Sequence, residues 1–177
     1  MRLFLAIAFP PALREALAAD TAAVRDGFAK ARFADPALYH LTLAFLGEVP
    51  QPRAADAVAA MKACRAAPFS LSIGALGRFR GREGDTVWRA VSAGKELFCL
   101  QRALSGELRN RGFALEARAY SPHLTLARAA RLRGGVTFAG LSERLPARET
   151  TAAGMTLFLS HRVEGRLTYT PLQEIHF

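Results

Sequence analysis

Cysteine and long apolar runs are both scarce in this sequence. The only cysteines, Cys64 and Cys99, form no CxxC pair, so neither a disulfide framework nor a thiolate metal site is indicated. No apolar run approaches the ~18 residues that span a bilayer. The apolar opening, residues 2–9, runs directly into two prolines and a polar helical pattern, which favours a buried strand over a signal peptide. We therefore expect a cytoplasmic protein that does not cross a membrane.

Lysine is also rare. The three lysines are Lys30, Lys62 and Lys95, yet lysine and arginine together number 24 against 15 acidic residues, for a net charge of +9. An excess of this sign favours an anionic partner such as nucleic acid. An arginine- and alanine-rich composition also follows from a GC-rich genome without selection for binding. The charge therefore supports a function inferred on other grounds but does not establish one.

The remaining composition is that of a folded domain, with 51% hydrophobic and 22% charged residues in a chain of 177. Hydrophobic periodicity and Gly/Pro punctuation predict strands over 2–9, 40–46, 69–76, 86–92, 123–127, 154–163 and 167–177, and helices over 10–30, 53–67 and 95–110. Residues 77–85 read as a loop rich in glycine and arginine, and the stretch around 134–146 is less regular. Because no low-complexity linker interrupts this order, we expect one α+β domain over residues 1–177.

One tetrapeptide occurs twice. The sequence His-Leu-Thr-Leu at residues 40–43 recurs at residues 123–126, an offset of 83 positions that is close to half of the chain. Each copy opens a predicted strand after a helix and a loop, as if one unit had been used twice. Two lobes related by an approximate twofold axis would bring the two copies face to face across a cleft.

The spacing within each copy puts its two polar residues on the same side of the strand. Residues i and i+2 of a strand share a face, so His40 projects with Thr42 and His123 with Thr125, while the leucines turn to the core. Two such pairs provide what in-line cleavage of a phosphodiester needs: a base, an acid, and donors to the non-bridging oxygens. No metal is required for this scheme. The other two histidines, at 161 and 176, have no such context, and we expect them to be structural.

The chain resembles the two-histidine (2H) phosphoesterases, and within them the RNA 2′,3′-cyclic phosphodiesterases, also called 2′-5′ RNA ligases. The matching segments are RLFLAI at 2–7, HLTLAFLGE at 40–48 and RAYSPHLTLAR at 118–128, and the order of helices and strands fits over essentially the whole chain. One departure is Tyr120, which stands where the family usually has phenylalanine.

This resemblance implies a bilobal α+β fold with two antiparallel sheets, pseudo-twofold symmetry, helices on the outer faces and a cleft between the lobes. It implies hydrolysis of 2′,3′-cyclic phosphate at RNA 3′ ends to a 2′-phosphate, with the related 2′-5′ ligation as the reverse reaction. His40 and His123 would be catalytic, and Thr42 and Thr125 would contact the phosphate. We expect His123 to act as base and His40 as acid, and the near-symmetry of the two motifs leaves the reverse assignment open. We expect no cofactor and no metal, and a monomer whose partner is RNA.

Three further sites are less defined by the sequence. Arg128 is implied by the resemblance as another phosphate contact, but simple strand parity puts it on the face opposite His123, so the strand must twist or bulge or the side chain must reach around. Arg78, Phe79, Arg80 and Arg82 mix an aromatic ring with guanidinium groups, a composition suited to RNA as well as to a merely soluble loop. Trp88 lies in a strand pattern, and we expect it in the core.

Three other functions compete with this hypothesis. A 2H enzyme acting on small cyclic phosphates or on 2′-5′ linked oligonucleotides would have the same histidine pair. A non-catalytic RNA-end binder could use the basic charge and the two threonines, but it would not need twin histidines. A metal hydrolase is disfavoured because the two histidines lie on separate strands, with no carboxylate or third histidine at ligand spacing.

Overall fold

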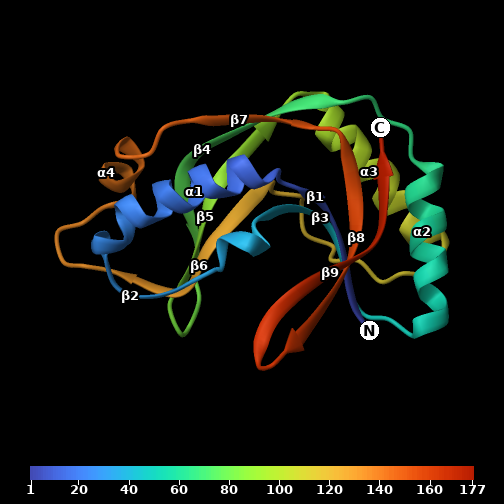
Figure 1. Ribbon diagram of the computed structural model, residues 1–177, viewed down its shortest axis with the longest axis horizontal. Helices are drawn as coiled ribbons and strands as arrows, with labels where there is room; N and C mark the ends of the chain where they lie inside the picture. The colour runs from blue at the N-terminus through green and yellow to red at the C-terminus, as the bar shows by residue number, and fades with distance from the viewer.

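The computed structural model describes residues 1–177 and contains two antiparallel sheets with helices around them (Figure 1). The strands are β1 (Arg2–Ala8), β2 (Phe28–Phe33), β3 (His40–Glu48), β4 (Phe69–Phe79), β5 (Asp85–Ala93), β6 (His123–Leu132), β7 (Arg148–Ala152), β8 (Gly154–Val163) and β9 (Arg166–His176). The α-helices are α1 (Pro11–Val24), α2 (Ala54–Ala63), α3 (Lys95–Asn110) and α4 (Phe138–Glu143), and short 3-10 turns η1 (Arg25–Gly27), η2 (Pro36–Leu38) and η3 (Gln51–Arg53) complete the order. No helix is both long enough and apolar enough to cross a membrane.

The chain passes back and forth between the two sheets. One has four strands in the order β3-β1-β8-β9, and the other has five in the order β2-β6-β5-β4-β7. Figure 1 shows α1 and α4 beside the five-stranded sheet and α2 and α3 beside the four-stranded sheet. The expected α+β fold with two antiparallel sheets is therefore confirmed. The two HxTL strands, β3 and β6, belong to different sheets and lie side by side where the sheets meet.

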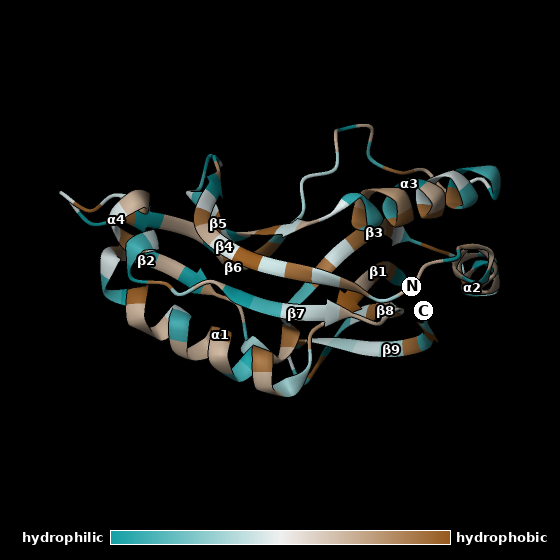
Figure 2. Cartoon of the chain, turned by 90° about the horizontal axis from the view of Figure 1, so that it is seen from above, coloured by the Kyte–Doolittle hydropathy of each residue, from teal (hydrophilic) through white to brown (hydrophobic).

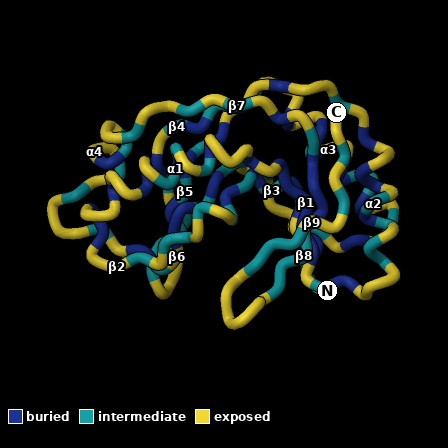
Figure 3. Tube along the Cα trace, viewed as in Figure 1, coloured by how far each residue is buried: buried dark blue, intermediate teal, exposed yellow.

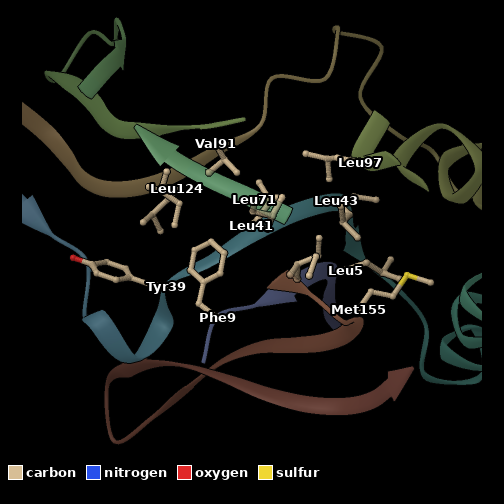
Figure 4. Packing of buried hydrophobic residues seen from close by; sticks show 14 of the residues in the cluster. Leu5, Phe9, Tyr39, Leu41, Leu43, Leu71, Val91, Leu97, Leu124 and Met155 are labelled. Carbon is tan, nitrogen blue, oxygen red and sulfur yellow. The ribbon is translucent and has the colours of Figure 1, made fainter. Parts of the chain in front are cut away.

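The core forms from the inward residues of both sheets. Figure 2 shows hydrophobic and hydrophilic residues alternating along the strands, and Figure 3 shows buried residues concentrated in them while the tip of the β8–β9 hairpin is exposed. The leucines of both repeated motifs, Leu41, Leu43, Leu124 and Leu126, are almost completely buried, as alternation predicts. Figure 4 shows three of them in the same cluster as Val91. Burying such side chains leaves the histidines and threonines on the other face.

The predicted helix over residues 10–30 is wrong at its end. Helix α1 stops at Val24, and Phe28 instead begins β2, where it pairs with Leu132 of β6. The break coincides with Asp26-Gly27, and a side chain on Gly27 would collide with Leu141 of α4. Strand β6 accordingly extends past residue 127 to pair with β2. In the stretch expected to be irregular, residues 138–143 form α4 and 148–152 form the edge strand β7.

The closing hairpin forms where the sequence predicts it. Strands β8 and β9 pair from Gly154 with His176 to Val163 with Arg166. At the turn, Glu164 and Gly165 both have positive φ, 49° and 78°. Two consecutive residues in this region match the tight two-residue turn that suits the twist of a hairpin.

A buried ionic cluster fastens α1 to the five-stranded sheet. Asp20 of α1 accepts hydrogen bonds from Arg89 of β5 (2.8 Å) and from two nitrogens of Arg148 of β7 (3.0 and 2.7 Å). Arg89 is only 1% exposed and also donates to three backbone carbonyls, so its donors are well used. Burial by itself would raise the pKa of Asp20, but the hydrogen bonds and charges of Arg148 and Arg89 outweigh it and hold that pKa below its usual range.

Candidate active site

The two repeated histidines have the same local geometry. His40 is the first residue of β3 and His123 the first of β6. In each ring Nδ1 faces the backbone carbonyl two residues earlier, Leu38 at 2.6 Å and Ser121 at 2.7 Å. A carbonyl can only accept, so Nδ1 carries the proton in both neutral rings and Nε2 is left as the acceptor. Both rings are therefore oriented with the nitrogen that can exchange a proton away from the backbone.

The threonines lie on the same faces as their histidines. The Thr42 hydroxyl lies 3.0 Å from Nε2 of His40. On the other sheet Thr125 pairs with Trp88 of β5, and His123 pairs with Ala90 of the same strand. Each half of the site thus offers an imidazole and, two residues along the strand, a hydroxyl.

Both strands contain a β-bulge at the fourth residue of the repeated motif, Leu43 in β3 and Leu126 in β6. In β3, the partners of Leu5 and Ala6 on β1 are Ala44 and Thr42; in β6, the partners of Val87 and Trp88 on β5 are Ala127 and Thr125. Two steps along β3 or β6 therefore oppose one step along the partner strand. The extra residue reverses the alternation of inward and outward side chains beyond the bulge. The bulges therefore occupy the same position in the two copies of the motif.

The bulge in β6 brings Arg128 to the site. Ala127 pairs with buried Val87 and is itself fully buried, so the next residue, Arg128, faces the same way as His123 and Thr125. The sequence allowed a twist, a bulge or a side chain that reaches around the strand, and the structure shows the bulge. At the equivalent place in β3, Phe45 emerges 39% exposed, with the guanidinium of Arg2 stacked 5.0 Å from its ring centroid.

Burial and charge both lower the histidine pKa values. For His40 the main cause is burial, opposed by the hydrogen bond to the Leu38 carbonyl and reinforced by the positive charges of His123 and Arg128. For His123 the pKa falls through burial and through the charges of Arg118 and Arg128, again opposed by its carbonyl hydrogen bond. Since the Arg128 charge acts on both rings, the three groups share one electrostatic environment.

Each histidine ring lies against two aromatic side chains. His40 packs between Phe4 (centroids 4.9 Å apart) and Tyr169 (5.3 Å). These contacts hold the ring of His40 in place. Burial also raises the pKa of the Tyr169 hydroxyl, so this group stays protonated at neutral pH.

His123 is packed in the same way by Phe79 (5.0 Å) and Trp88 (6.1 Å). The expectation that Trp88 belongs to the core is wrong, because its indole is only partly buried and lies over Gly77, where any side chain would collide with it. Its Nε1–H has no hydrogen-bond partner. Of these aromatic neighbours, the sequence indicates only Phe79 as a site residue. Phe4, Trp88 and Tyr169 come from β1, β5 and β9, far from the motifs in the chain, and no local signal marks them.

Tyr120 joins the second motif to the first. Its hydroxyl donates a 3.0 Å hydrogen bond to the backbone carbonyl of Thr42, and burial raises its pKa well above the usual range. A phenylalanine here could not make this bond. The departure from the family pattern therefore adds a link between the segment before His123 and strand β3.

A cavity of about 370 Å³ adjoins the histidines. His123 and Thr42 line it, whereas His40 and Thr125 do not. From there it continues past Phe45 to the segment 115–121 and to helix α3, which contributes Arg102 and Arg109. The cavity offers an aromatic ring and cationic groups beside the histidine pair, a suitable lining for a nucleotide.

The residues predicted from the segment 77–85 are not brought together. Phe79 ends β4 and reaches His123, whereas Arg78 pairs with Val87, on the opposite face, where it binds Asp85 at 2.9 Å and stacks on Phe138. Arg80 and Arg82 lie exposed in the turn before β5.

The remaining histidines lie apart from the pair. His161 contacts the Thr170 hydroxyl at 2.8 Å within the β8–β9 hairpin, and His176 is the last residue of β9. No group of three or more His, Cys, Asp or Glu side chains is arranged to hold a metal ion.

The sequence and the fold both match known proteins. The profile of the 2′-5′ RNA ligase superfamily matches residues 7–163. The chain belongs to this superfamily. Its members include relatives named RNA 2′,3′-cyclic phosphodiesterase: one from Methanothermobacter thermautotrophicus is 32% identical over 131 residues, which are 72% of this chain and 71% of that protein. Another, from Geobacillus stearothermophilus, is 40% identical over 93 residues, 51% of this chain but only 30% of that protein.

Solved structures of the superfamily have the same architecture. E. coli LigT complexed with 3′-AMP superposes with a TM-score of 0.80 at 27% identity, covering 99% of this chain and 97% of that one. The protein TT0787 of Thermus thermophilus gives 0.77 at 25% identity, with the same two coverages. The superfamily fold therefore extends over essentially the full length of the chain, whereas the alignment with the Geobacillus protein spans less than a third of that relative.

Proposed function

We propose that this protein hydrolyses 2′,3′-cyclic phosphate at RNA 3′ ends to a 2′-phosphomonoester, with His40 and His123 as its acid–base pair. The observation that carries the proposal is the duplicated geometry: two histidines on different sheets, each with Nδ1 held by a backbone carbonyl so that Nε2 is the nitrogen able to exchange a proton. The nature of the substrate is taken from the relatives named RNA 2′,3′-cyclic phosphodiesterase.

The reaction needs one histidine to accept a proton and the other to donate one. His123 would take a proton from the attacking water, and His40 would give its proton to the departing ribose O3′. Water adds to phosphorus, the bond from phosphorus to O3′ breaks, and the products are a 2′-phosphate and a 3′-hydroxyl. Base and acid must lie on opposite sides of phosphorus along one axis, and residues on two facing sheets can meet this requirement.

The lowered histidine pKa values fit this cycle. In the free protein both rings are neutral at neutral pH, because burial and neighbouring positive charges disfavour protonation. A bound phosphate anion favours the protonated form of a histidine ring beside it. The protonated ring that acts as the acid therefore forms when substrate is bound. Thr42, Thr125 and Arg128 would donate to the non-bridging oxygens, where negative charge develops.

The same groups would serve the related ligation, in which an RNA 5′-hydroxyl takes the place of water and a 2′-5′ linkage results. Microscopic reversibility requires the base of one direction to be the acid of the other, so the pair can also cleave such a linkage. The scheme uses only groups of this chain and needs no metal or cofactor.

The test is turnover of a short RNA ending in 2′,3′-cyclic phosphate by the purified protein in excess EDTA. The position of the product phosphate is then determined by ³¹P NMR or with a 3′-specific phosphatase. A 2′-phosphate formed in chelator supports the proposal. A 3′-phosphate product would refute the regiochemistry, and loss of activity in EDTA with recovery on adding a divalent ion would make the protein a metal hydrolase. Tight binding of the RNA end without turnover would make it a binding protein.

A further inference from the structure

Four cationic side chains form a compact array on strands β2 and β6. Lys30 pairs with Arg131, and Arg32 pairs with Arg128, so two like-charged pairs face each other directly across the ladder. All four side chains are exposed, and none takes part in an ion pair with a carboxylate. We call these residues the basic array.

The basic array lies on the face of the sheet that carries the histidines. Arg128 is there because of the bulge at Leu126, and its partner Arg32 precedes Phe33, which pairs with buried Ala127. A second irregularity, where Ala129 has φ 50°, turns Ala130 into the core and leaves Arg131 outward again. The array therefore begins at the candidate phosphate site and runs away from it for three residues of β6, ~10 Å at about 3.3 Å per residue.

This arrangement is unfavourable in the protein alone. Like charges directly opposite on neighbouring strands destabilise a sheet, and no acidic side chain compensates them here. Protection of an exposed edge against strand pairing is a common use of charge, and it would account for Lys30 and Arg32 on edge strand β2. It does not account for Arg128 and Arg131, because β6 is an interior strand paired on both sides. A bound polyanion would offset the repulsion among all four.

We propose that the basic array binds the ribose-phosphate backbone of the RNA on the 5′ side of its cyclic end. This inference rests on the proposed function and specifies its substrate as an RNA strand rather than a cyclic mononucleotide. Arg128 contacts the terminal phosphate, and Arg32, Lys30 and Arg131 follow the phosphodiesters upstream. A cyclic mononucleotide has no phosphodiester that reaches the Lys30–Arg131 pair.

The experiment compares kcat/KM on adenosine 2′,3′-cyclic phosphate and on an adenosine hexanucleotide ending in 2′,3′-cyclic phosphate. The test variant is Lys30→Ala/Arg131→Ala. The matched control is Lys62→Ala/Arg65→Ala, which removes one lysine and one arginine near the end of α2, on the far side of the molecule from β2 (Figure 1). Thermal unfolding checks that both variants are folded.

The test variant should lower the ratio of hexanucleotide to mononucleotide kcat/KM about tenfold, and the control should leave it unchanged. The plot of log kcat/KM for the hexanucleotide against log salt concentration has a negative slope. Loss of two phosphate contacts should reduce the magnitude of that slope by about 1.4, at ~0.7 per contact with a single strand. An unchanged ratio would overturn the proposal. If Arg102→Ala/Arg109→Ala lowered the ratio and Lys30→Ala/Arg131→Ala did not, the proposal would also be overturned, and the RNA would lie along α3.

The two proposals can fail separately. If the wild-type protein turns over neither substrate, the function proposed above fails, and the basic array is then tested by fluorescence anisotropy with the same labelled hexanucleotide. Weaker binding by about tenfold in the Lys30→Ala/Arg131→Ala variant, with the control unchanged, would support the RNA-binding surface. Equal binding by the test variant and the wild type would refute it.

Discussion

Arg128 provides the sharpest test of the site, because its position depends on the bulge and its charge acts on both histidines. Simple alternation would put its guanidinium on the face opposite His123, whereas the bulge puts it on the same face. If Arg128 binds the phosphate as proposed, replacing it with alanine removes one charge-assisted hydrogen bond, worth about 1.5–3 kcal/mol. At about 1.4 kcal/mol per factor of ten, we expect kcat/KM to fall roughly ten- to two-hundredfold.

The pH profile gives a second, independent readout of Arg128. Burial is the main reason why the pKa values of His40 and His123 are low, and the Arg128 charge lowers both further. Removing that charge raises both pKa values, so both limbs of the bell-shaped profile should move to higher pH in Arg128→Ala. Arg128→Lys keeps the charge but lacks the planar guanidinium donors, so its limbs should stay in place while kcat/KM still falls.

The assay is kcat/KM for adenosine 2′,3′-cyclic phosphate between about pH 4 and 9, at constant ionic strength. Arg65→Ala serves as the control, since Arg65 is an exposed arginine beyond the end of α2 that makes no ion pair. Limbs that do not move in Arg128→Ala, or a loss of kcat/KM below threefold, would show that the guanidinium is not at the site.

Four further outcomes are expected. His40→Ala and His123→Ala should each lower kcat by about two to four orders of magnitude, and a variant that keeps more than a tenth of the activity would make that histidine structural. An activated leaving group should rescue His40→Ala but not His123→Ala, because such a group needs no acid; rescue of the other variant would exchange the two roles. Thr42→Ala should cost about ten- to a few hundredfold in kcat, whereas Thr42→Ser, which keeps the hydroxyl, should stay near wild type; equal losses would point to packing. Asp20→Ala should lower the free energy of unfolding in urea by about 3–5 kcal/mol at neutral pH, since it leaves Arg89 buried without a carboxylate. Because the folded-state pKa of Asp20 is lowered, its contribution is present above the unfolded pKa and is lost as the pH falls below about 4, so the two proteins should converge in acid.

Much of the fold could be predicted from local pattern. The hairpin around Glu164-Gly165 and the helix over residues 95–110 lie where periodicity and turn residues place them. The sequence predicts a helix through Phe28 because Val24 and Phe28 are four residues apart and fit one face of a helix. Phe28 is buried in a sheet instead, and its partner Leu132 is more than a hundred positions away, so no local signal indicates the pairing.

The same division applies to the site. Alternation within a strand is a property of the backbone, so the motif alone predicts that each repeated histidine shares a face with its threonine and that the leucines are buried. The catalytic roles of these residues stay predictions that the variants above test.

The other side chains that join these residues are set by the pairing between strands. A bulge depends on the register between two strands, and that register is set by partners distant in the chain, so the side on which Arg128 emerges could not be read from its own strand. The rings around the histidines likewise come from four other strands. The basic array exists only because β2 and β6 pair, which places two widely separated groups of cations opposite each other.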